Sequence, residues 1–286
     1  MQQTRGVLQQ TPVPAGRTAP ADRSPQRSTT LAGRRLWQFL PWIVPLGLLV
    51  LWQALSSLGL LNPRVLPAPV AVVTAAIELS GQGRLLPDIW ISFQRAISGF
   101  LVGGSIGFAL GLLNGYLPLS ERLLDSTLQM LRTIPSLSLI PLVILWFGIG
   151  DEARLFLVSA GVLFPIYINT LHGVRSVDPQ LIEMGRVYGL STRALFWEII
   201  LPGALPSILV GVRYALGIMW LTLIVAETIA ADSGIGHITM EAREFMRTNV
   251  VVMGILIYAL LGKLADSTAR LAERRLLRWH PNYQQV

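Results

Sequence analysis

The sequence predicts an all-α membrane protein with about six transmembrane helices. Its 286 residues are 52% hydrophobic and only 14% charged, with a mean hydropathy of +0.55. Soluble domains carry about 25% charged residues, so this chain has too few polar groups to cover a globule in water. The apolar residues also gather into six runs, each near the roughly 20 residues that a helix needs to cross a bilayer.

The positions of these runs set the expected domain organisation. Residues 1–35 are rich in Pro, Arg, Ser, Thr and Gln without apolar periodicity, which predicts a disordered cytoplasmic tail. A transmembrane domain at residues 36–270 follows, with a cytoplasmic loop at residues 173–204, and a cytoplasmic tail covers residues 271–286. We expect spans at residues 36–58, 96–117, 128–149, 153–171, 205–229 and 250–264, and a short helix outside the hydrocarbon layer at residues 69–80.

The distribution of arginine orients the spans, because cytoplasmic loops of membrane proteins carry an excess of Lys and Arg. With six spans, both tails and the loop at residues 173–204 share one side. That side holds Arg5, Arg17, Arg23, Arg27, Arg34, Arg35, Arg175, Arg186, Arg193, Lys263, Arg270, Arg274, Arg275 and Arg278. The opposite loops are poorer in positive charge, with Arg64, Arg84, Arg95, Arg154, Arg243 and Arg247. Both termini are therefore expected in the cytoplasm.

The sequence also lacks the signatures of several protein classes. The net charge of +7 lies at the ends of apolar spans, without a basic patch interleaved with aromatics, so we expect no nucleic-acid partner. There is no cysteine, and His172, His237 and His280 lie far apart, so neither a disulfide nor a metal site is predicted. The sequence contains no GxxxxGK(S/T) phosphate loop and no GxSxG or HExxH motif, so no catalytic site is predicted. Energy for transport must come from another subunit or from an ion gradient.

Five glycines recur every four residues along the second expected span. Small residues at this spacing let two helix backbones approach closely in a membrane. We favour static helix packing over a sliding contact as the role of this stripe. The stripe consists of Gly99, Gly103, Gly107, Gly111 and Gly115.

The fifth expected span carries candidate residues for a substrate pathway. Arg213, Trp220 and Glu227 fall on one helical face, together with Gly217 and Ile224. Ionisable residues inside a membrane are expensive and usually face the bundle interior, where Arg213 would attract an anion. The alternative is that the Arg213 side chain reaches the cytoplasmic interface and that Glu227 accepts backbone hydrogen bonds near the outer end.

The third expected span adds Arg132 near its start, either as a pathway residue or as an anchor at the membrane interface. Pro135 and Pro141 in the same span each free a backbone carbonyl and predict a kink. Such breaks line cavities in transporters, but they are also frequent in membrane helices that have no such role.

The cytoplasmic loop contains an amphipathic segment from Glu183 to Glu198. Gly189 divides it, which predicts two short helices that meet at a turn. Such an elbow presents an apolar edge flanked by Arg186 and Arg193, which a partner groove can hold. The alternative is an ordinary amphipathic helix on the lipid surface. The apolar positions are Met184, Val187, Tyr188, Leu190, Leu195 and Phe196.

The spacing of this segment resembles the coupling loop of ABC-importer permeases, whose pattern is E-A-A-x3-G-x9-I-x-L-P. The matching residues are Glu183, Gly189, Ile199, Leu201 and Pro202, with Met184 and Gly185 in place of the two alanines. Longer stretches, such as MLRTIPSLSLIPLVILWFGIG and ILPGALPSILVGVRYALGIMWLTLIVAE, are similar to the sulfonate, taurine and nitrate branch of these permeases, and most similar to the aliphatic-sulfonate permeases. The resemblance covers about residues 36–283.

The resemblance implies the fold of a type I ABC importer permease in a bacterial inner membrane. It further implies a homodimer that works with two ATP-binding ABC subunits and an extracytoplasmic substrate-binding protein. ATP and Mg²⁺ would bind to the ATPase subunits, and this chain would hold no cofactor. The implied activity is import of aliphatic sulfonates. The alternatives are import of taurine, nitrate or another small anion by the same class of permease, or a gradient-driven carrier or channel.

Overall fold

The computed structural model describes the backbone of residues 31–280 and the side chains of residues 43–280 except Ala230. Within these residues the regular structure is helical, and no strand occurs. The chain divides into two units between Leu49 and Val50, inside α1 (Leu31–Ser57). The second unit contains all the other described helices.

The two predicted tails lie largely outside the described residues, which exclude residues 1–30 and 281–286. The helices next to these tails extend past the expected boundaries at residues 36 and 270. α1 already begins at Leu31, and the last helix runs on to Leu276. Helix propagation adds one backbone hydrogen bond for each residue, so a helix continues past the end of its apolar run.

The second unit is a succession of long helices joined by short ones. In chain order they are α2 (Pro69–Gly81), α3 (Leu85–Tyr116), α4 (Pro118–Arg132), the 3-10 helix η1 (Ser136–Leu139), α5 (Ile140–Phe147), α6 (Asp151–Arg175), α7 (Pro179–Val187), α8 (Thr192–Leu195), the π-helix η2 (Phe196–Ile200), α9 (Leu201–Ala230), α10 (Ile235–Glu244) and α11 (Thr248–Leu276).

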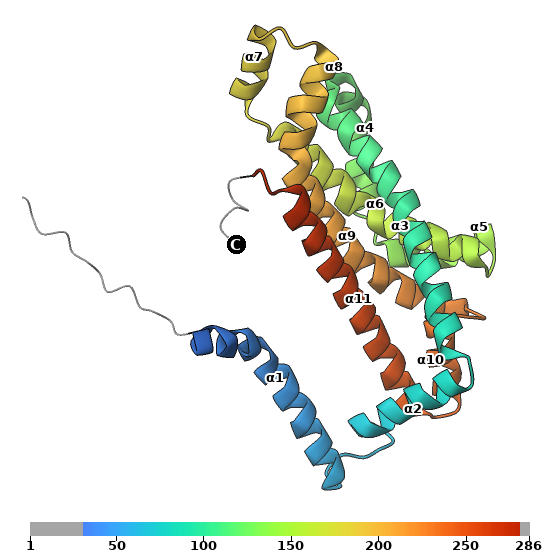
Figure 1. Cartoon of the computed structure of the whole chain (residues 1–286). Coiled ribbons are helices and arrows are strands. Elements are labelled where there is room, and N and C mark those ends of the chain that lie inside the picture. Colours follow the sequence, from blue (N-terminus) through green and yellow to red (C-terminus); the bar gives the residue numbers. More distant parts are fainter. Residues whose placement is uncertain (1–30, 281–286) are drawn as a thin grey trace, which may run out of the picture. The chain divides into compact units, whose positions relative to one another are not determined.

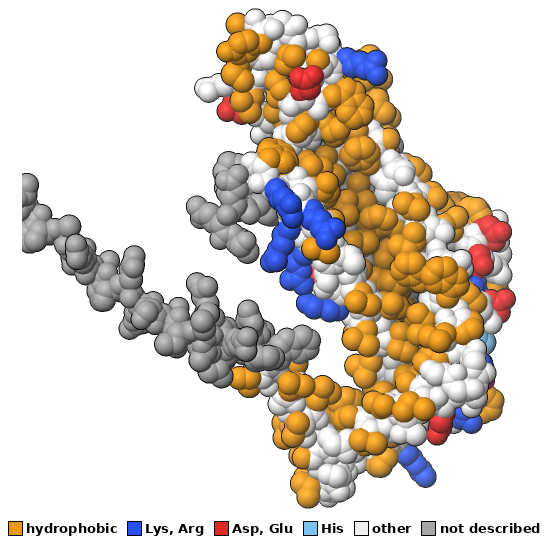
Figure 2. All heavy atoms as spheres, viewed as in Figure 1, with side chains coloured by type: hydrophobic (Ala, Val, Ile, Leu, Met, Phe, Trp, Pro, Cys, Tyr) orange, Lys and Arg blue, Asp and Glu red, His pale blue; other side chains and the backbone are white. Residues whose placement is uncertain are grey.

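Within this unit, α3 packs along α6 and α6 along α9, while α11 lies against α9 and α10 (Figure 1). α7 and α8 lie at one end of the long helices, and α2 and α10 lie at the other end (Figure 1). Many large apolar side chains remain exposed, and Figure 2 shows them covering much of the visible face. Lipid tails solvate such a surface, and water does not.

Four helices of the described region are long and apolar enough to cross a membrane. They are Leu85–Tyr116, Asp151–Arg175, Thr192–Ile229 and Thr248–Leu276, which confirms the second, fourth, fifth and sixth predicted spans. α2 likewise confirms the short helix predicted at residues 69–80. The first predicted span lies on α1, whose part with described side chains, Ile43–Ser57, is a shorter apolar helix. The described residues therefore contain fewer candidate spans than the six that the sequence predicts.

The third predicted span, residues 128–149, is not one helix. α4 and the η1–α5 segment meet at a bend of 81° and together form a fifth candidate span that is broken. Pro135 stands at the break with extended backbone (φ −61°, ψ 123°). A residue that precedes proline, here Ile134, is disfavoured in the helical region. The kink predicted from Pro135 is confirmed, and it divides the predicted third span into two helical segments.

The glycine stripe of α3 faces α6. A Cβ atom built on Gly103 would lie 2.1 Å from the carbonyl oxygen of Ser159, and one on Gly107 would lie 2.3 Å from that of Leu163. The other three glycines meet side chains of α6 at similarly short range, namely Gly99 with Val158, Gly111 with Thr170 and Gly115 with Val174. Because no side chain fits between these backbones, the stripe sets the distance between α3 and α6.

We predict that Gly103→Ala lowers the stability of the folded protein. The added methyl group must displace a backbone carbonyl, and overpacking of this kind costs about 1–3 kcal/mol or more. Thermal unfolding in detergent should give a lower midpoint for this variant. The control is Gly81→Ala, whose added Cβ meets no atom within 4 Å. Equal midpoints for the two variants would contradict the close contact.

Candidate functional site

The chain between α6 and α9 folds into two short helices that meet at a turn, here called the elbow (residues 179–200). α7 begins at Pro179, where Asp178 caps the helix by accepting a hydrogen bond from the Gln180 amide (2.9 Å). Ser191 caps α8 by accepting from the Ala194 amide (3.2 Å). Both helices therefore begin at capping residues supplied by the neighbouring sequence.

Gly189 makes the turn of the elbow. Its φ of +79° lies in the left-handed region that other residues rarely adopt. The Leu190 amide donates to the Gly185 carbonyl, and the Gly189 amide donates to the Arg186 carbonyl, both at 3.0 Å. These two bonds form the Schellman motif, which ends a helix at a left-handed residue. A larger residue at position 189 would strain this turn.

Gly185 lets the two arms of the elbow touch. A Cβ atom at this position would lie 2.6 Å from Ile199 Cδ1 and 3.1 Å from Leu195 Cδ1. α7 thus packs directly on the segment that enters α9. That segment, η2, is a single π-helical turn containing Ile199. π-helical turns are rare in proteins, and those that occur often lie at functional sites.

The outer edge of the elbow is apolar and exposed. Val187 is 86% exposed, Tyr188 is 79% exposed, and Met184 is about half exposed at 47%. Leu195, by contrast, is buried against the end of α6 and the start of α9. A contiguous exposed apolar edge of this kind marks a surface for another protein or for a membrane.

The remaining residues of the expected coupling pattern flank this edge. Glu183 is exposed on α7, next to Met184. Leu201 and Pro202 form the first turn of α9 and are half-buried. The structure thus places the whole pattern on one continuous path from α7 to α9.

The opposite end of α9 holds a buried carboxylate. Glu227 is fully buried, and its two oxygens accept hydrogen bonds from Tyr258 Oη (2.7 Å), Ser92 Oγ (2.8 Å), Arg95 Nη1 (3.1 Å) and the Gly236 amide (3.1 Å). A buried charge is tolerated only when it is paired and hydrogen-bonded. These four donors come from α3, α10 and α11, so the single carboxylate of α9 joins three other helices.

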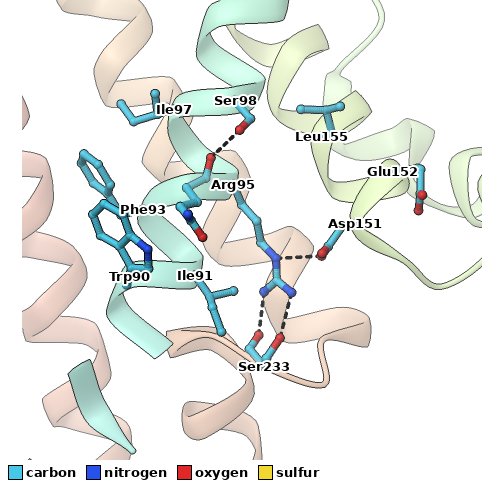
Figure 3. Close-up of a pocket in the computed structure, with 11 residues that line it drawn as sticks. Trp90, Ile91, Phe93, Arg95, Ile97, Ser98, Asp151, Glu152, Leu155 and Ser233 are labelled. Carbon is cyan, nitrogen blue, oxygen red and sulfur yellow. Dashed lines mark hydrogen bonds and ion pairs between the residues drawn. The ribbon is translucent and has the colours of Figure 1, made fainter. Parts of the chain in front are cut away.

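Arg95 extends this cluster toward α6. Its Nε donates to Asp151 Oδ1 (2.8 Å), and its two terminal nitrogens donate to the Ser233 carbonyl (2.7 Å) and the Ser233 hydroxyl (2.9 Å) (Figure 3). Ser233 lies in the loop between α9 and α10. The same loop is held by Asp88, whose Oδ1 accepts from the Gly234 amide (2.7 Å).

This cluster is not predicted from the sequence, because Arg95 was expected in a loop on the side opposite the cytoplasm. The structure places Arg95 inside α3, where its exposed fraction is 9%. A signal was present: Asp88, Ser92 and Arg95 recur at steps of four and three and form one polar face of a helix. The prediction was wrong because the apolar run that defines a span starts later than the helix itself.

The structure does not bring the predicted pathway residues of α9 together. Arg213 pairs through Nε with Asp266 Oδ1 on α11 (2.7 Å) and is partly exposed. Trp220 is buried, with its ring 6.4 Å from that of Tyr258. Glu227 accepts a backbone N–H, that of Gly236, as the alternative interpretation expected. All three residues therefore make contacts with other helices, α10 or α11.

An open pocket of about 780 Å³ lies beside Arg95, between α3, α6 and the α9–α10 loop (Figure 3). Trp90 and Phe93 line its apolar side, and Asp151 and Glu152 line its polar side. Because Arg95 already pairs with Glu227 and Asp151, the charge left in the pocket is negative. This pocket is therefore unsuited to an anion.

Two further observations bear on the chemistry of the described residues. The Arg84 guanidinium at the start of α3 donates to Glu241 of α10 (2.6 Å), which holds the pKa of that carboxyl below its usual value. Among the residues with described side chains, no group of three or more His, Asp and Glu could hold a metal ion.

Comparison with known proteins identifies the class to which this architecture belongs. The sequence profile of the family described as "binding-protein-dependent transport system inner membrane component" matches residues 99–278, which include α6, the elbow, α9 and α11. This chain belongs to that family. It is therefore a permease subunit, a transport component and not an enzyme, and it has the type I ABC importer fold.

Individual relatives cover most of this permease. A protein named "putative aliphatic sulfonates transport permease protein SsuC" from Escherichia coli (strain K12) is 59% identical, over 87% of this chain and 94% of that protein. The protein of the same name from Bacillus subtilis (strain 168) is 44% identical, over 85% and 88%. The "taurine transport system permease protein TauC" of Escherichia coli (strain K12) is 34% identical, over 83% and 88%.

A solved structure supports the fold alone. A chain in the crystal structure of an amino acid ABC transporter with histidines is 16% identical to this permease and superimposes with a TM-score of 0.55. The match covers 70% of this chain and 97% of that chain.

We predict that Glu227→Gln and Arg95→Gln each destabilise the permease, and that the double variant loses less stability than the two single losses added together. Removing one partner leaves the other charge buried, which costs about 3–5 kcal/mol, whereas removing both relieves that charge. The apparent unfolding midpoint in detergent should therefore fall less in the double variant than the sum of the two single losses. Strict additivity would show that the two side chains do not interact.

Proposed function

We propose that this chain is the pore-forming permease subunit of an ATP-driven importer of aliphatic sulfonates in a bacterial inner membrane. The observation that carries the substrate class is the 59% identity, over nearly the full length of both chains, to a protein named as an aliphatic sulfonates permease. Identity to the taurine permease is much lower, at 34%. Import of taurine, nitrate or a similar small anion is the second candidate.

The elbow is the proposed docking site for the ATPase. Its exposed edge of Met184, Val187 and Tyr188 has the amphipathic character of a helix that lies in a groove. Arg186 and Arg193 flank the edge, so the complementary groove is apolar with acidic margins. Glu183, Gly185, Gly189, Ile199, Leu201 and Pro202 position that edge relative to α9.

The elbow packs on the segment that continues into α9, which supports a mechanical role. α7 contacts η2, and η2 continues into α9, so a displacement of the docked edge moves the start of α9. ATP binding to the partner ATPase would favour one of two pore states, and hydrolysis would restore the other. In this scheme ATP and Mg²⁺ bind only to the ATPase.

The proposed assembly contains two copies of this permease, two ATPase subunits and an extracytoplasmic binding protein. Both termini and the elbow face the cytoplasm, in keeping with the arginine-rich tails. α2, α10 and the Glu227 cluster then lie at the outer end, where the binding protein delivers substrate. Of the candidate pathway residues, Arg132 and Arg213 keep exposed guanidinium groups, while Trp220 and Glu227 hold the helices together.

The substrate class is tested by growth. A strain that lacks this permease should fail to grow on an alkanesulfonate as the only sulfur source, and should grow normally on sulfate and on taurine. Expression of the permease from a plasmid should restore growth. Loss of growth on taurine alone would replace the first candidate with the second.

The docking role is tested by charge insertion at the exposed edge. Val187→Asp and Tyr188→Asp should each reduce co-purification of the ATPase about tenfold or more, because a carboxylate cannot enter an apolar groove without a partner. Thr192→Asp is the control, since it adds the same charge to an exposed polar position of the elbow that is not one of the three apolar edge residues. Wild-type co-purification of both edge variants would contradict docking at this surface.

A further inference from the structure

The break between α4 and η1 lies midway across the membrane. The inner end of α3 adjoins the elbow, where Tyr116 meets Phe196, and α6 begins at the outer end, where Asp151 binds Arg95. The chain from α4 to α5 therefore crosses from one side to the other. Its depth follows from packing on the 25-residue helix α6.

Contacts on both sides of the break determine its position along α6, and hence its depth in the bilayer. Before the break, Leu128 packs with Tyr167 and Leu171 in the second half of α6. After the break, Val143 packs with Ala153 and Leu157 near the start of α6. Residues 133–138 therefore lie beside the central turns of α6, at the middle of the bilayer. Figure 1 shows α5 lying crosswise to the long helices.

Non-helical backbone at this depth cannot face lipid, because lipid offers no hydrogen-bond partners. η1 lies against α6 and α9, which places the break on the protein side of the bundle. Thr133 and Pro135 are nonetheless exposed in the single chain. At this depth irregular backbone must be covered by protein or line a water-filled cavity, and a position beside α6 and α9 suits the cavity of a transport pathway.

Arg132, the last residue of α4, brings a positive charge to this break. Its side chain is exposed and forms no ion pair or hydrogen bond with any described residue. Arg95 and Arg213 differ, because each is neutralised by a carboxylate at hydrogen-bond distance. An unneutralised charge inside a membrane is costly and marks a functional site.

The hydroxyl groups of the break are not equivalent. Thr133 and Ser138 donate to the carbonyls of Met130 and Pro135, both at 2.7 Å. Ser136 has no such bond among the described residues, so its proton is available to a ligand. The break thus offers one guanidinium and one hydroxyl donor.

We propose that the break at residues 132–138 is a substrate-binding site in the pore, in which Arg132 binds the sulfonate group and Ser136 donates a further hydrogen bond. This inference rests on the proposed function. A sulfonate carries one negative charge on three acceptor oxygens, and a guanidinium donates two parallel hydrogen bonds to such a group. Discontinuous membrane helices provide binding sites at this depth in transporters. The exposed apolar side chains of Ile134 and Leu137 suit the alkyl part of the substrate.

The first test measures ATP-dependent uptake of radiolabelled ethanesulfonate by the complete complex in proteoliposomes. Arg132→Gln should lower the rate about tenfold or more, the expected effect of losing a charge-assisted hydrogen bond. Arg132→Lys should recover part of the rate with a raised KM, because the charge remains without the planar fork. Arg122→Gln is the matched control, an exposed arginine near the start of the same helix.

The outcomes of this test distinguish failure of the proposed importer from failure of the proposed binding site. No uptake by the wild-type complex would reject the sulfonate importer itself and the site with it. Wild-type uptake with equal rates for Arg132→Gln and Arg122→Gln would reject the site and leave the importer standing.

A second test does not depend on transport rate and remains decisive if Arg132→Gln fails to assemble. The chain has no cysteine, so Ser136→Cys introduces a unique thiol. A methanethiosulfonate reagent that carries an ethylsulfonate group should label this thiol in the assembled complex, and ethanesulfonate should slow the labelling. Leu145→Cys, 79% exposed on the apolar surface of α5, should stay unlabelled by the charged reagent. An unreactive Ser136→Cys, or labelling that ethanesulfonate does not slow, would overturn the proposal.

Discussion

The absence of water from the hydrocarbon layer is the constraint on which the rest of this structure depends. A helix in lipid satisfies its own backbone, but any side-chain charge or broken turn must find its partner within the protein. Glu227 meets this demand with four donors from three other helices. The glycine stripe acts under the same constraint, because lipid-solvated helices associate through close backbone packing and not through hydrophobic burial.

The Glu227 hydrogen bonds and the glycine stripe hold some helix pairs tightly together, while other contacts are apolar. α3 and α6 are fixed along their length by the glycine stripe, and the C-terminal end of α9 is fixed by Glu227. The N-terminal end of α9 is joined to the elbow through one π-helical turn, and its contacts there are apolar. The proposed ATPase would therefore act at the end of α9 that is held by apolar contacts and not by the buried ion pair.

The arginines of the membrane region show the same division. Arg95 donates to Glu227, Asp151 and Ser233, and it joins α3 to α6, α9 and the α9–α10 loop. Arg213 is neutralised by Asp266 of the neighbouring helix. Arg132 has no such carboxylate partner among the described residues, and it lies at the one bend that divides a candidate span in the part of the chain that the structure describes. The presence of an arginine in a span is thus less informative than whether a carboxylate lies within reach of it.

The sequence by itself determined the features that depend on neighbouring residues. Hydropathy located four spans and the short outer helix, Gly189 specified the turn of the elbow, and Pro135 specified a break. Each follows from local composition or from the backbone preference of one residue. Only the tertiary structure decided that Arg95 binds Glu227, 132 residues away, and that Trp220 and Glu227 turn into the protein while Arg213 faces α11. Helical periodicity shows which side chains share a face, but the rotation of that face toward lipid, pore or neighbouring helix depends on how distant helices pack.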